Sequence, residues 1–148
     1  MVITRDAESQ LGPLLDSVGF SDEVLVVDCG STDGTVALAR SRGARVIEQS
    51  WLGFGRQKQF AVGQAAHDWV LCLDADERVT PELARSIEMS FRSQTYLALR
   101  MARRNRFLGA WLAHGEGYPD WCLRLFHRAH ANWSSDDVHE SVLTTTPV

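Results

Sequence analysis

The sequence predicts an α/β fold: one domain, residues 1–148, with a mostly parallel central sheet flanked by helices. Over residues 1–92, short apolar runs alternate with segments of helical periodicity, the order expected of right-handed βαβ units. Two of the apolar runs end in carboxylates, at Asp28 and at Asp74. Because parallel strands open their carboxyl ends on one edge of a sheet, these acids should share a ligand-binding rim.

Four strands are predicted in this first part, at residues 2–4, 24–28, 44–47 and 69–73. Each is a short, nearly uninterrupted apolar run, which is typical of strands that are buried in a parallel sheet. The first run is unusually short, and no closing helix precedes the last residue, Val148. We therefore expect the domain to be truncated at both ends.

The first helix is indicated by apolar residues that recur at i, i+3, i+4 and i+7 between positions 11 and 18. Pro13 is tolerated only within a first turn, where backbone N–H groups have no helical partner. This predicts a helix start near Glu8 or Ser9.

The later helices carry end signals. A helix over 35–42 should end at Gly43, which suits the left-handed position after a helix. Residues 56–66 form the next helix. Thr80 is placed to cap a further helix that begins at Pro81.

Residues 93–148 do not continue the alternation of strands and helices that is predicted for residues 1–92. Strands are predicted at 96–101, 121–126 and 138–143, separated by an arginine-rich segment and a polar loop.

Composition excludes several classes of protein. With 45% hydrophobic and 23% charged residues, the 148-residue chain is typical of a globular domain. The net charge of −4 argues against a nucleic-acid partner, and no apolar stretch is long enough to span a bilayer. The three cysteines form neither a disulfide framework nor a metal motif, which favours a reducing cytosol.

The acidic stretch after the fourth strand supports two interpretations. Asp74, Asp76 and Glu77 lie so close in sequence that they would repel one another unless a cation joins them. Hard carboxylate oxygens suit Mg²⁺ or Mn²⁺, usually together with substrate phosphates, which predicts a metal–diphosphate site. The alternative is a solvated acidic turn before the next helix.

The motifs resemble those of the family 2 glycosyltransferases, and more narrowly the bacterial lipopolysaccharide core glucosyltransferases. Residues 28–35, DCGSTDGT, are similar to the D-S-G-S-T-D-G-T signature, and residues 73–77 to the DxD motif. The resemblance continues through segments 53–61, 103–109, 118–120, 123–126 and 138–140.

The resemblance implies a GT-A fold and an inverting transfer of a hexose, glucose, from a UDP-sugar to a lipopolysaccharide core-type acceptor. Residues 1–92 would then be the nucleotide-binding half and 93–148 the acceptor-side part. The implied nucleotide-sugar contacts are Asp28, Ser31, Asp33, Gln57, Lys58 and Asp74. The implied ligands of Mg²⁺ or Mn²⁺ are Asp76 and His139.

An inverting transfer also needs a base for the acceptor hydroxyl. Asp120 is the candidate, although it stands where relatives carry a Glu-Asp pair, and a turn-capping role is the alternative. Glu116 is the reserve. His114, Arg104 and Trp121 are the candidate acceptor contacts.

The arginines between 100 and 106 form either a solvated face or a docking patch for an anionic glycolipid acceptor at the cytoplasmic face of the inner membrane. The second possibility implies peripheral membrane contact.

The sequence departs from the family pattern after the first strand, where Asp6 and Ala7 replace the usual Asn and Glu. This departure and the clipped ends leave one rival open, a non-catalytic nucleotide-sugar-binding fragment. A nucleotidyltransferase is a second rival, but the Gly-rich basic loop that it needs is missing from the sequence after the first strand.

Overall fold

The computed structural model describes residues 1–93, 96–108, 110–112, 118–136 and 139–148. The first part of the chain alternates strands and helices: β1 (Val2–Thr4), α1 (Glu8–Ser17), β2 (Leu25–Asp28), α2 (Thr35–Ser41), β3 (Arg45–Glu48), α3 (Phe54–Gln64), β4 (Trp69–Leu71) and α4 (Pro81–Ser93). The second part is made of strands: β5 (Ala98–Arg103), β6 (Arg106–Phe107), β7 (Ala110–Trp111), β8 (Asp120–His127), β9 (Ala131–Trp133) and β10 (Val142–Thr144).

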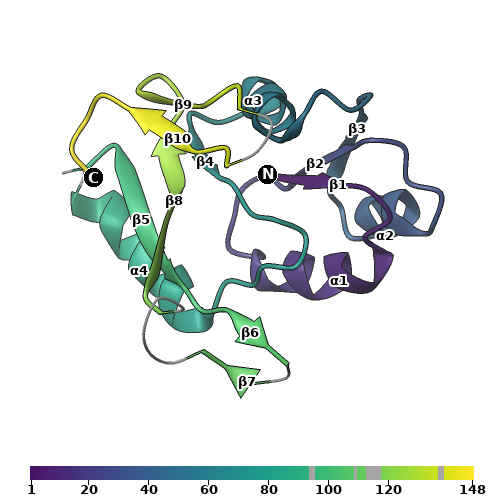
Figure 1. Cartoon of the computed structure of the whole chain (residues 1–148), viewed down its shortest axis with the longest axis horizontal. Helices are drawn as coiled ribbons and strands as arrows, with labels where there is room; N and C mark the ends of the chain where they lie inside the picture. The colour runs from purple at the N-terminus through teal and green to yellow at the C-terminus, as the bar shows by residue number, and fades with distance from the viewer. Residues whose placement is uncertain (94–95, 109, 113–117, 137–138) are drawn as a thin grey trace.

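The strands β1, β2 and β3 form a parallel sheet in that order, as the βαβ pattern predicts. A parallel bridge between Val2 and Leu73 connects β1 to the chain that leaves β4. The carboxyl ends of β2 and β4 therefore open on either side of β1. Figure 1 shows this arrangement, with α1 and α2 on one side of the parallel strands and α3 on the other.

Alternation along β2 produces two apolar layers. Val26 packs with residues of α1 and α2, whereas Leu25 and Val27 pack against Ala61 of α3. Successive strand residues point to opposite faces, so an uninterrupted apolar run is what a sheet covered on both sides requires.

The remaining central strands join in the order β4-β8-β5, with β8 antiparallel to both neighbours. Helix α4 covers one face, where Ile87 packs with Met101 and Leu125. On the other face, Phe126 packs with Trp133 of β9. The strand pairs are therefore parallel among β1, β2 and β3 and antiparallel among β4, β8 and β5.

Element positions largely agree with the sequence-based predictions. The first helix begins at Glu8, Gly43 has a φ of 78°, and the Thr80 hydroxyl accepts a hydrogen bond from the N–H of Leu83 at 3.2 Å. The position of Pro13 was predicted wrongly, because it lies in the second turn of α1. Its missing N–H leaves the carbonyl of Ser9 without a helical donor, and Ser9 is exposed to water.

Two features were absent from the sequence-based predictions: β9 and the β6–β7 hairpin. Both consist of strands of only two or three residues, too short to show a hydrophobic period. The strand predicted over 138–143 is observed as β10, Val142–Thr144, and residue 138 lies outside the described part. Within the described ranges, no helix combines the length and apolar character needed to cross a membrane.

Candidate active site

The loop that follows β2, residues 28–35, is organised around the buried carboxylate of Asp28. One oxygen accepts hydrogen bonds from the hydroxyls of Thr4 at 2.8 Å and Ser31 at 2.5 Å. The other accepts the N–H groups of Gly30 at 3.0 Å and Ser31 at 2.8 Å. Burial raises the pKa of Asp28, but these hydrogen bonds outweigh it and the net pKa is lowered. We call residues 28–35 the Asp28 loop.

The chain after β1 is bound to the Asp28 loop by reciprocal hydrogen bonds. The Asp6 carboxylate accepts the N–H of Thr32 at 2.7 Å, and the N–H of Asp6 donates to the Ser31 hydroxyl at 2.8 Å. Asp6 has a φ of 47°, in the left-handed region that Asn and Asp tolerate best. An Asp in place of the family's Asn therefore preserves both the backbone conformation and the acceptor.

Asp33 is the residue of this loop that caps helices. Its carboxylate accepts the N–H of Thr35 at the start of α2 at 3.0 Å and the N–H of Glu8 at the start of α1 at 3.1 Å. One side chain thus satisfies donors at two helix N-termini. Ser31 and Thr32 bond to the carboxylates of Asp28 and Asp6 instead.

The loop that follows β4, residues 74–77, is held by ion pairs. The Asp74 carboxylate lies 2.9 Å from the Lys58 ammonium and 2.8 Å from the Arg124 guanidinium. Burial raises the pKa of Asp74, but the positive charges of Arg124 and Lys58 outweigh it and the net pKa is lowered. We call residues 74–77 the Asp74 loop.

These pairs belong to a chain in which four carboxylates alternate with three cations. Arg124 also contacts Glu77 at 2.6 Å, Lys58 contacts Glu140 at 2.8 Å, and Arg103 contacts Glu77 at 3.3 Å. The complete order is Glu140, Lys58, Asp74, Arg124, Glu77, Arg103 and Asp120. The acids that the sequence predicted to be joined by a metal are therefore partly neutralised by the chain's own cations.

Arg124 reaches the Asp74 loop from an irregular position of β8. The register with β5 pairs Leu99 with Leu125 but Arg100 with Leu123, so Arg124 is the extra residue. A bulge of this kind re-aims a side chain. Arg124 is 8% exposed, and its Nε is buried without a hydrogen-bond partner among the described residues.

Lys58 and its neighbour Gln57 are both buried on α3, but only Lys58 reaches the acidic loop. The Lys58 ammonium also lies 4.7 Å from the centre of the Trp133 ring. The Gln57 side chain accepts the N–H of Leu52 at 3.2 Å and donates to the carbonyl of Gln49 at 3.3 Å. Gln57 therefore holds the loop before α3, and its predicted nucleotide contact stays a prediction.

Gly55 allows α3 to approach the segment that carries Glu140. A Cβ added at Gly55 would stand 2.1 Å from the carbonyl oxygen of Ser134, a distance that no side chain could occupy. The close approach brings Lys58 and Glu140 together although they are 82 residues apart in the chain.

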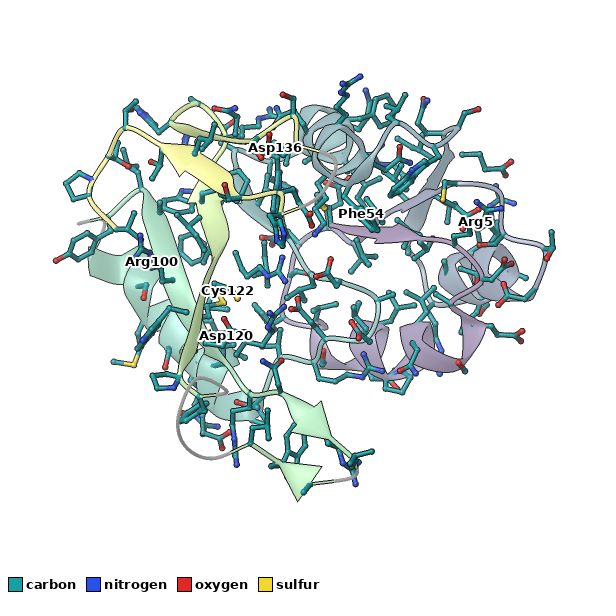
Figure 2. All side chains as sticks on the ribbon, in the orientation of Figure 1. Arg5, Phe54, Arg100, Asp120, Cys122 and Asp136 are labelled. Carbon is teal, nitrogen blue, oxygen red and sulfur yellow. The ribbon has the colours of Figure 1, made fainter. Side chains whose placement is uncertain are left out.

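Asp120, the predicted base, begins β8. One carboxylate oxygen accepts the Nε and an Nη of Arg103 at 2.9 and 2.7 Å and the Asn105 amide at 3.1 Å. Hydrogen bonds from Arg103 and then from Asn105 hold the pKa of Asp120 below its usual value. The other oxygen is near only the Cys122 thiol, at 3.7 Å, within the described residues. Figure 2 shows Asp120 and Cys122 along the same strand. Glu116 lies outside the described residues.

Asp76 and His139, the predicted metal ligands, are both exposed. In the described part of the chain, no partner binds the Asp76 carboxylate, and no three His, Cys, Asp or Glu side chains are close enough to hold an ion. A free carboxylate near the edge of the sheet fits Mg²⁺ or Mn²⁺ when a diphosphate supplies further oxygens. The metal roles of both residues stay predictions.

Two of the three predicted acceptor residues, Arg104 and Trp121, are described, and both are exposed. Arg104 is exposed and lies 5.5 Å from the centre of the Trp111 ring. Trp121 is 61% exposed and follows Asp120 on β8, so alternation directs it to the opposite face of the sheet from Asp120. His114 lies outside the described residues.

Sequence reasoning assigned no individual role to Arg124, Arg103 or Glu140. All three lie in the segments 103–109, 123–126 and 138–140 that carried the family resemblance. The family resemblance therefore included these residues, but it did not indicate their partners, which lie 17 to 82 positions away along the chain.

A cavity of about 850 Å³ lies away from these ion pairs. Its walls include Leu14, Val18, Trp69, Ile87 and Phe91, and it reaches none of the residues from Asp74 to Glu77. The carboxylates of Asp22, Glu23, Asp68 and Glu88 also line the cavity, but none of them belongs to the Asp28 loop, the Asp74 loop or the ion pairs described above.

Comparison with known proteins identifies the family. The model of "Glycosyl transferase family 2" matches residues 1–133. An uncharacterized glycosyltransferase of Rickettsia typhi is 36% identical over 96% of this chain and 51% of its own length. The lipopolysaccharide core biosynthesis glycosyltransferase LpsC of Rhizobium meliloti is 32% identical over 96% of this chain and 55% of its own length. The chain thus spans about half the length of these relatives.

Solved structures agree with this assignment at the level of the fold. Residues 1–349 of S. aureus TarS superpose with a TM-score of 0.66 at 20% identity, covering 86% of this chain and 46% of TarS. Mannosyl-3-phosphoglycerate synthase from Rubrobacter xylanophilus gives a TM-score of 0.54 at 27% identity, over 64% of this chain and 35% of the synthase. The fold is that of the GT-A glycosyltransferases. With most of its length matched by the family model and by relatives above 30% identity, the chain belongs to glycosyl transferase family 2.

Proposed function

We propose that this chain contains the donor-binding site and the catalytic base of an inverting glycosyltransferase. It moves a hexose, glucose, from a UDP-sugar to a lipopolysaccharide core-type glycan at the cytoplasmic face of the inner membrane. The single observation that carries the proposal is the Asp74 loop. At one edge of the sheet it presents a carboxylate fixed by Lys58 and Arg124, followed by the unengaged carboxylate of Asp76.

The donor and the acceptor are supported by different relatives. LpsC, by its name a lipopolysaccharide core biosynthesis glycosyltransferase, is 32% identical over nearly the whole chain and supports the acceptor class. TarS, which shares the fold, has been solved with UDP-GlcNAc and with UDP, and supports a UDP-sugar donor. The choice of glucose rests on the resemblance of the motifs to the core glucosyltransferases.

The roles of the residues follow from their contacts. In this proposal, Asp74 is held in place to meet the ribose or diphosphate, and Asp76, with His139, would bind Mg²⁺ or Mn²⁺ together with the diphosphate. A divalent ion there would offset the charge that develops on the leaving diphosphate. Ser31 and Asp33 are proposed to line the nucleoside end. The Asp28 carboxylate already bonds four donors, so its part is to shape that loop.

Asp120 is the proposed base. The acceptor oxygen would attack the anomeric carbon as the bond to UDP breaks, and Asp120 would take the hydroxyl proton. Arg103 and Asn105 occupy one oxygen of Asp120 and leave the other to receive that proton. The lowered pKa keeps the carboxylate ionised at neutral pH, although it also makes Asp120 a weaker base.

The ion pair of Asp120 favours a second candidate function, nucleotide-sugar binding without transfer. A carboxylate that is fully committed to Arg103 would be a structural anchor and would take no part in proton transfer. The two candidates differ in one measurable respect, because both bind the donor but only the first turns it over.

Calorimetric titration with UDP-glucose, with and without Mn²⁺, tests donor binding. We expect Mn²⁺-dependent binding that Asp76→Asn removes, whereas Asp22→Asn, an exposed carboxylate outside the site, leaves it intact. Binding that ignores Mn²⁺ or survives Asp76→Asn would contradict the metal role.

Glucose transfer to a lipopolysaccharide core oligosaccharide tests the base. Asp120→Asn should lower turnover by about 100-fold or more, as loss of a general base does, with unchanged donor affinity. Donor binding without turnover in the unaltered chain would select the second candidate function.

A further inference from the structure

The β6–β7 hairpin contributes no residue to the Asp74 loop or to the chain of ion pairs around it. Arg106 pairs with Trp111 and Phe107 with Ala110, and a hydrogen bond of 2.9 Å from the N–H of Leu112 to the carbonyl of Asn105 closes its base. Figure 1 shows the hairpin projecting from the body of the molecule below β5 and β8.

The tip of the hairpin exposes apolar side chains to water. Leu108 is 91% exposed and Trp111 is 58% exposed. Leu108 also has a φ of 47°, a region that is costly for a bulky side chain. Leu108 lies in the turn of the hairpin, and its side chain gains no burial there. Backbone strain and exposed apolar side chains both concentrate at sites that bind a partner.

The same hairpin concentrates positive charge in an otherwise acidic chain. Residues 98–112 contain four arginines and no carboxylate, whereas the whole chain has a net charge of −4. Arg103 is paired with Asp120 and Glu77. Arg104, just before the hairpin, and Arg106, on β6, lie 5.5 and 5.8 Å from the Trp111 ring centre. Cations beside an exposed tryptophan and leucine match a surface that is anionic and apolar at once.

We propose that the β6–β7 hairpin docks this chain on the surface of a bilayer that contains anionic lipids. Leu108 and Trp111 enter the interface between headgroups and acyl chains, and Arg104 and Arg106 face lipid phosphates. A soluble anionic glycan would match the arginines but would leave the exposed leucine unused. Charge and apolar exposure together therefore favour the membrane over a free glycan.

Docking through the hairpin would place Asp120, the proposed base, beside the membrane. The hairpin follows directly after Arg103, whose guanidinium holds Asp120. The inference rests on the proposed function only in its last step, that the acceptor presented to Asp120 is carried by a lipid. Vesicle binding needs neither donor nor acceptor, so it can fail or succeed independently of sugar transfer.

Flotation of the purified chain with vesicles tests the proposal. Vesicles of phosphatidylcholine mixed with phosphatidylglycerol are expected to bind the chain, and vesicles of phosphatidylcholine alone to bind it far less. Leu108→Asp should lower binding to the anionic vesicles by about tenfold or more, because it removes the inserted side chain and adds a like charge. Arg104→Ala should lower it by about fivefold.

Matched controls are available elsewhere on the surface. Leu143→Asp changes a leucine that is 52% exposed on β10, and Arg85→Ala removes an exposed arginine of α4. Both should leave vesicle binding unchanged. Equal losses of vesicle binding in the hairpin variants and in the controls would overturn the proposal. So would equal binding to anionic and neutral vesicles. Release of the chain from anionic vesicles by free core oligosaccharide would also overturn it.

Discussion

The Asp28 loop and the Asp74 loop lie at the carboxyl ends of β2 and β4, the two strands on either side of β1, yet they are held in opposite ways. The Asp28 carboxylate is surrounded by four neutral donors, from Thr4, Gly30 and Ser31. The Asp74 carboxylate is held by two cations, Lys58 and Arg124, that come from distant elements. The first loop therefore needs only β1 and the chain that follows it, whereas the second exists only once α3, β4 and β8 are assembled.

This difference bears on function. Neutral hydrogen bonds fix a loop without leaving charge for a ligand, since all the acceptors of Asp28 are already used. The ion pairs of the Asp74 loop can exchange partners, because a diphosphate or a metal ion could replace one member of the chain. The loop held by ion pairs is therefore the better candidate for binding that changes during a reaction.

Lys58→Met should have the largest effect on stability. Lys58 is 3% exposed and neutralises both Asp74 and Glu140, which would be left facing an uncharged side chain. Removal of one partner from a buried ion pair costs about 3 kcal/mol, because the remaining charge is uncompensated. Urea unfolding measures the loss. Arg40→Met, which breaks the exposed pair with Glu48, should cost less than about 1 kcal/mol, and equal losses would contradict the special role of Lys58.

Asp28→Asn should cost less, about 2 kcal/mol, because an amide cannot accept all four hydrogen bonds and leaves buried donors unsatisfied. The same unfolding measurement applies, with the exposed Asp22→Asn as the control. If the Asp28 loop is purely local, the two losses from Lys58→Met and Asp28→Asn should add in the double variant. A strongly non-additive result would show that the two loops are coupled.

The sequence predicted the first loop better than the second for a physical reason. Three of the four donors to Asp28 come from Gly30 and Ser31, within three positions of it, so a short stretch of sequence indicates this loop. The periodicity of residues 1–92 likewise indicated the order of strands and helices. Both signals are local.

The chain of ion pairs could not be predicted from short stretches of the sequence. It depends on the bulge that turns Arg124 toward Asp74 and on the close approach that Gly55 permits. Both are properties of strand register and helix packing, which have no local sequence signal. The acids of the Asp74 loop by themselves predict a metal site, whereas Arg124, which pairs with Asp74 and Glu77, lies about 50 positions further along the chain.

Acid should weaken the Asp28 loop in a way that the Asn variant reveals. The pKa of Asp28 is lower in the folded chain than its ordinary value, so its stabilising contribution is present above that value and is lost as pH falls through the folded pKa. The difference in unfolding free energy between the unaltered chain and Asp28→Asn should therefore narrow between pH 7 and about pH 3. A constant difference would mean that folding does not lower the pKa of Asp28.

The smallest expected effect on stability, below about 1 kcal/mol, belongs to Arg103→Lys, because Arg103 is 39% exposed and its pairs are screened by water. Lysine keeps the charge but loses the fork that donates twice to Asp120, so the pKa of Asp120 should rise toward its ordinary value. Carbon-13 NMR titration of the Asp120 carboxyl measures that rise, and Arg100→Lys, a neighbouring arginine on β5, is the control. If Asp120 is the base, the acid limb of the kcat/KM profile for glucose transfer should move to higher pH by the same amount. An Asp120 whose pKa rises while the acid limb stays in place would be an anchor for β8, and the base would have to be sought elsewhere.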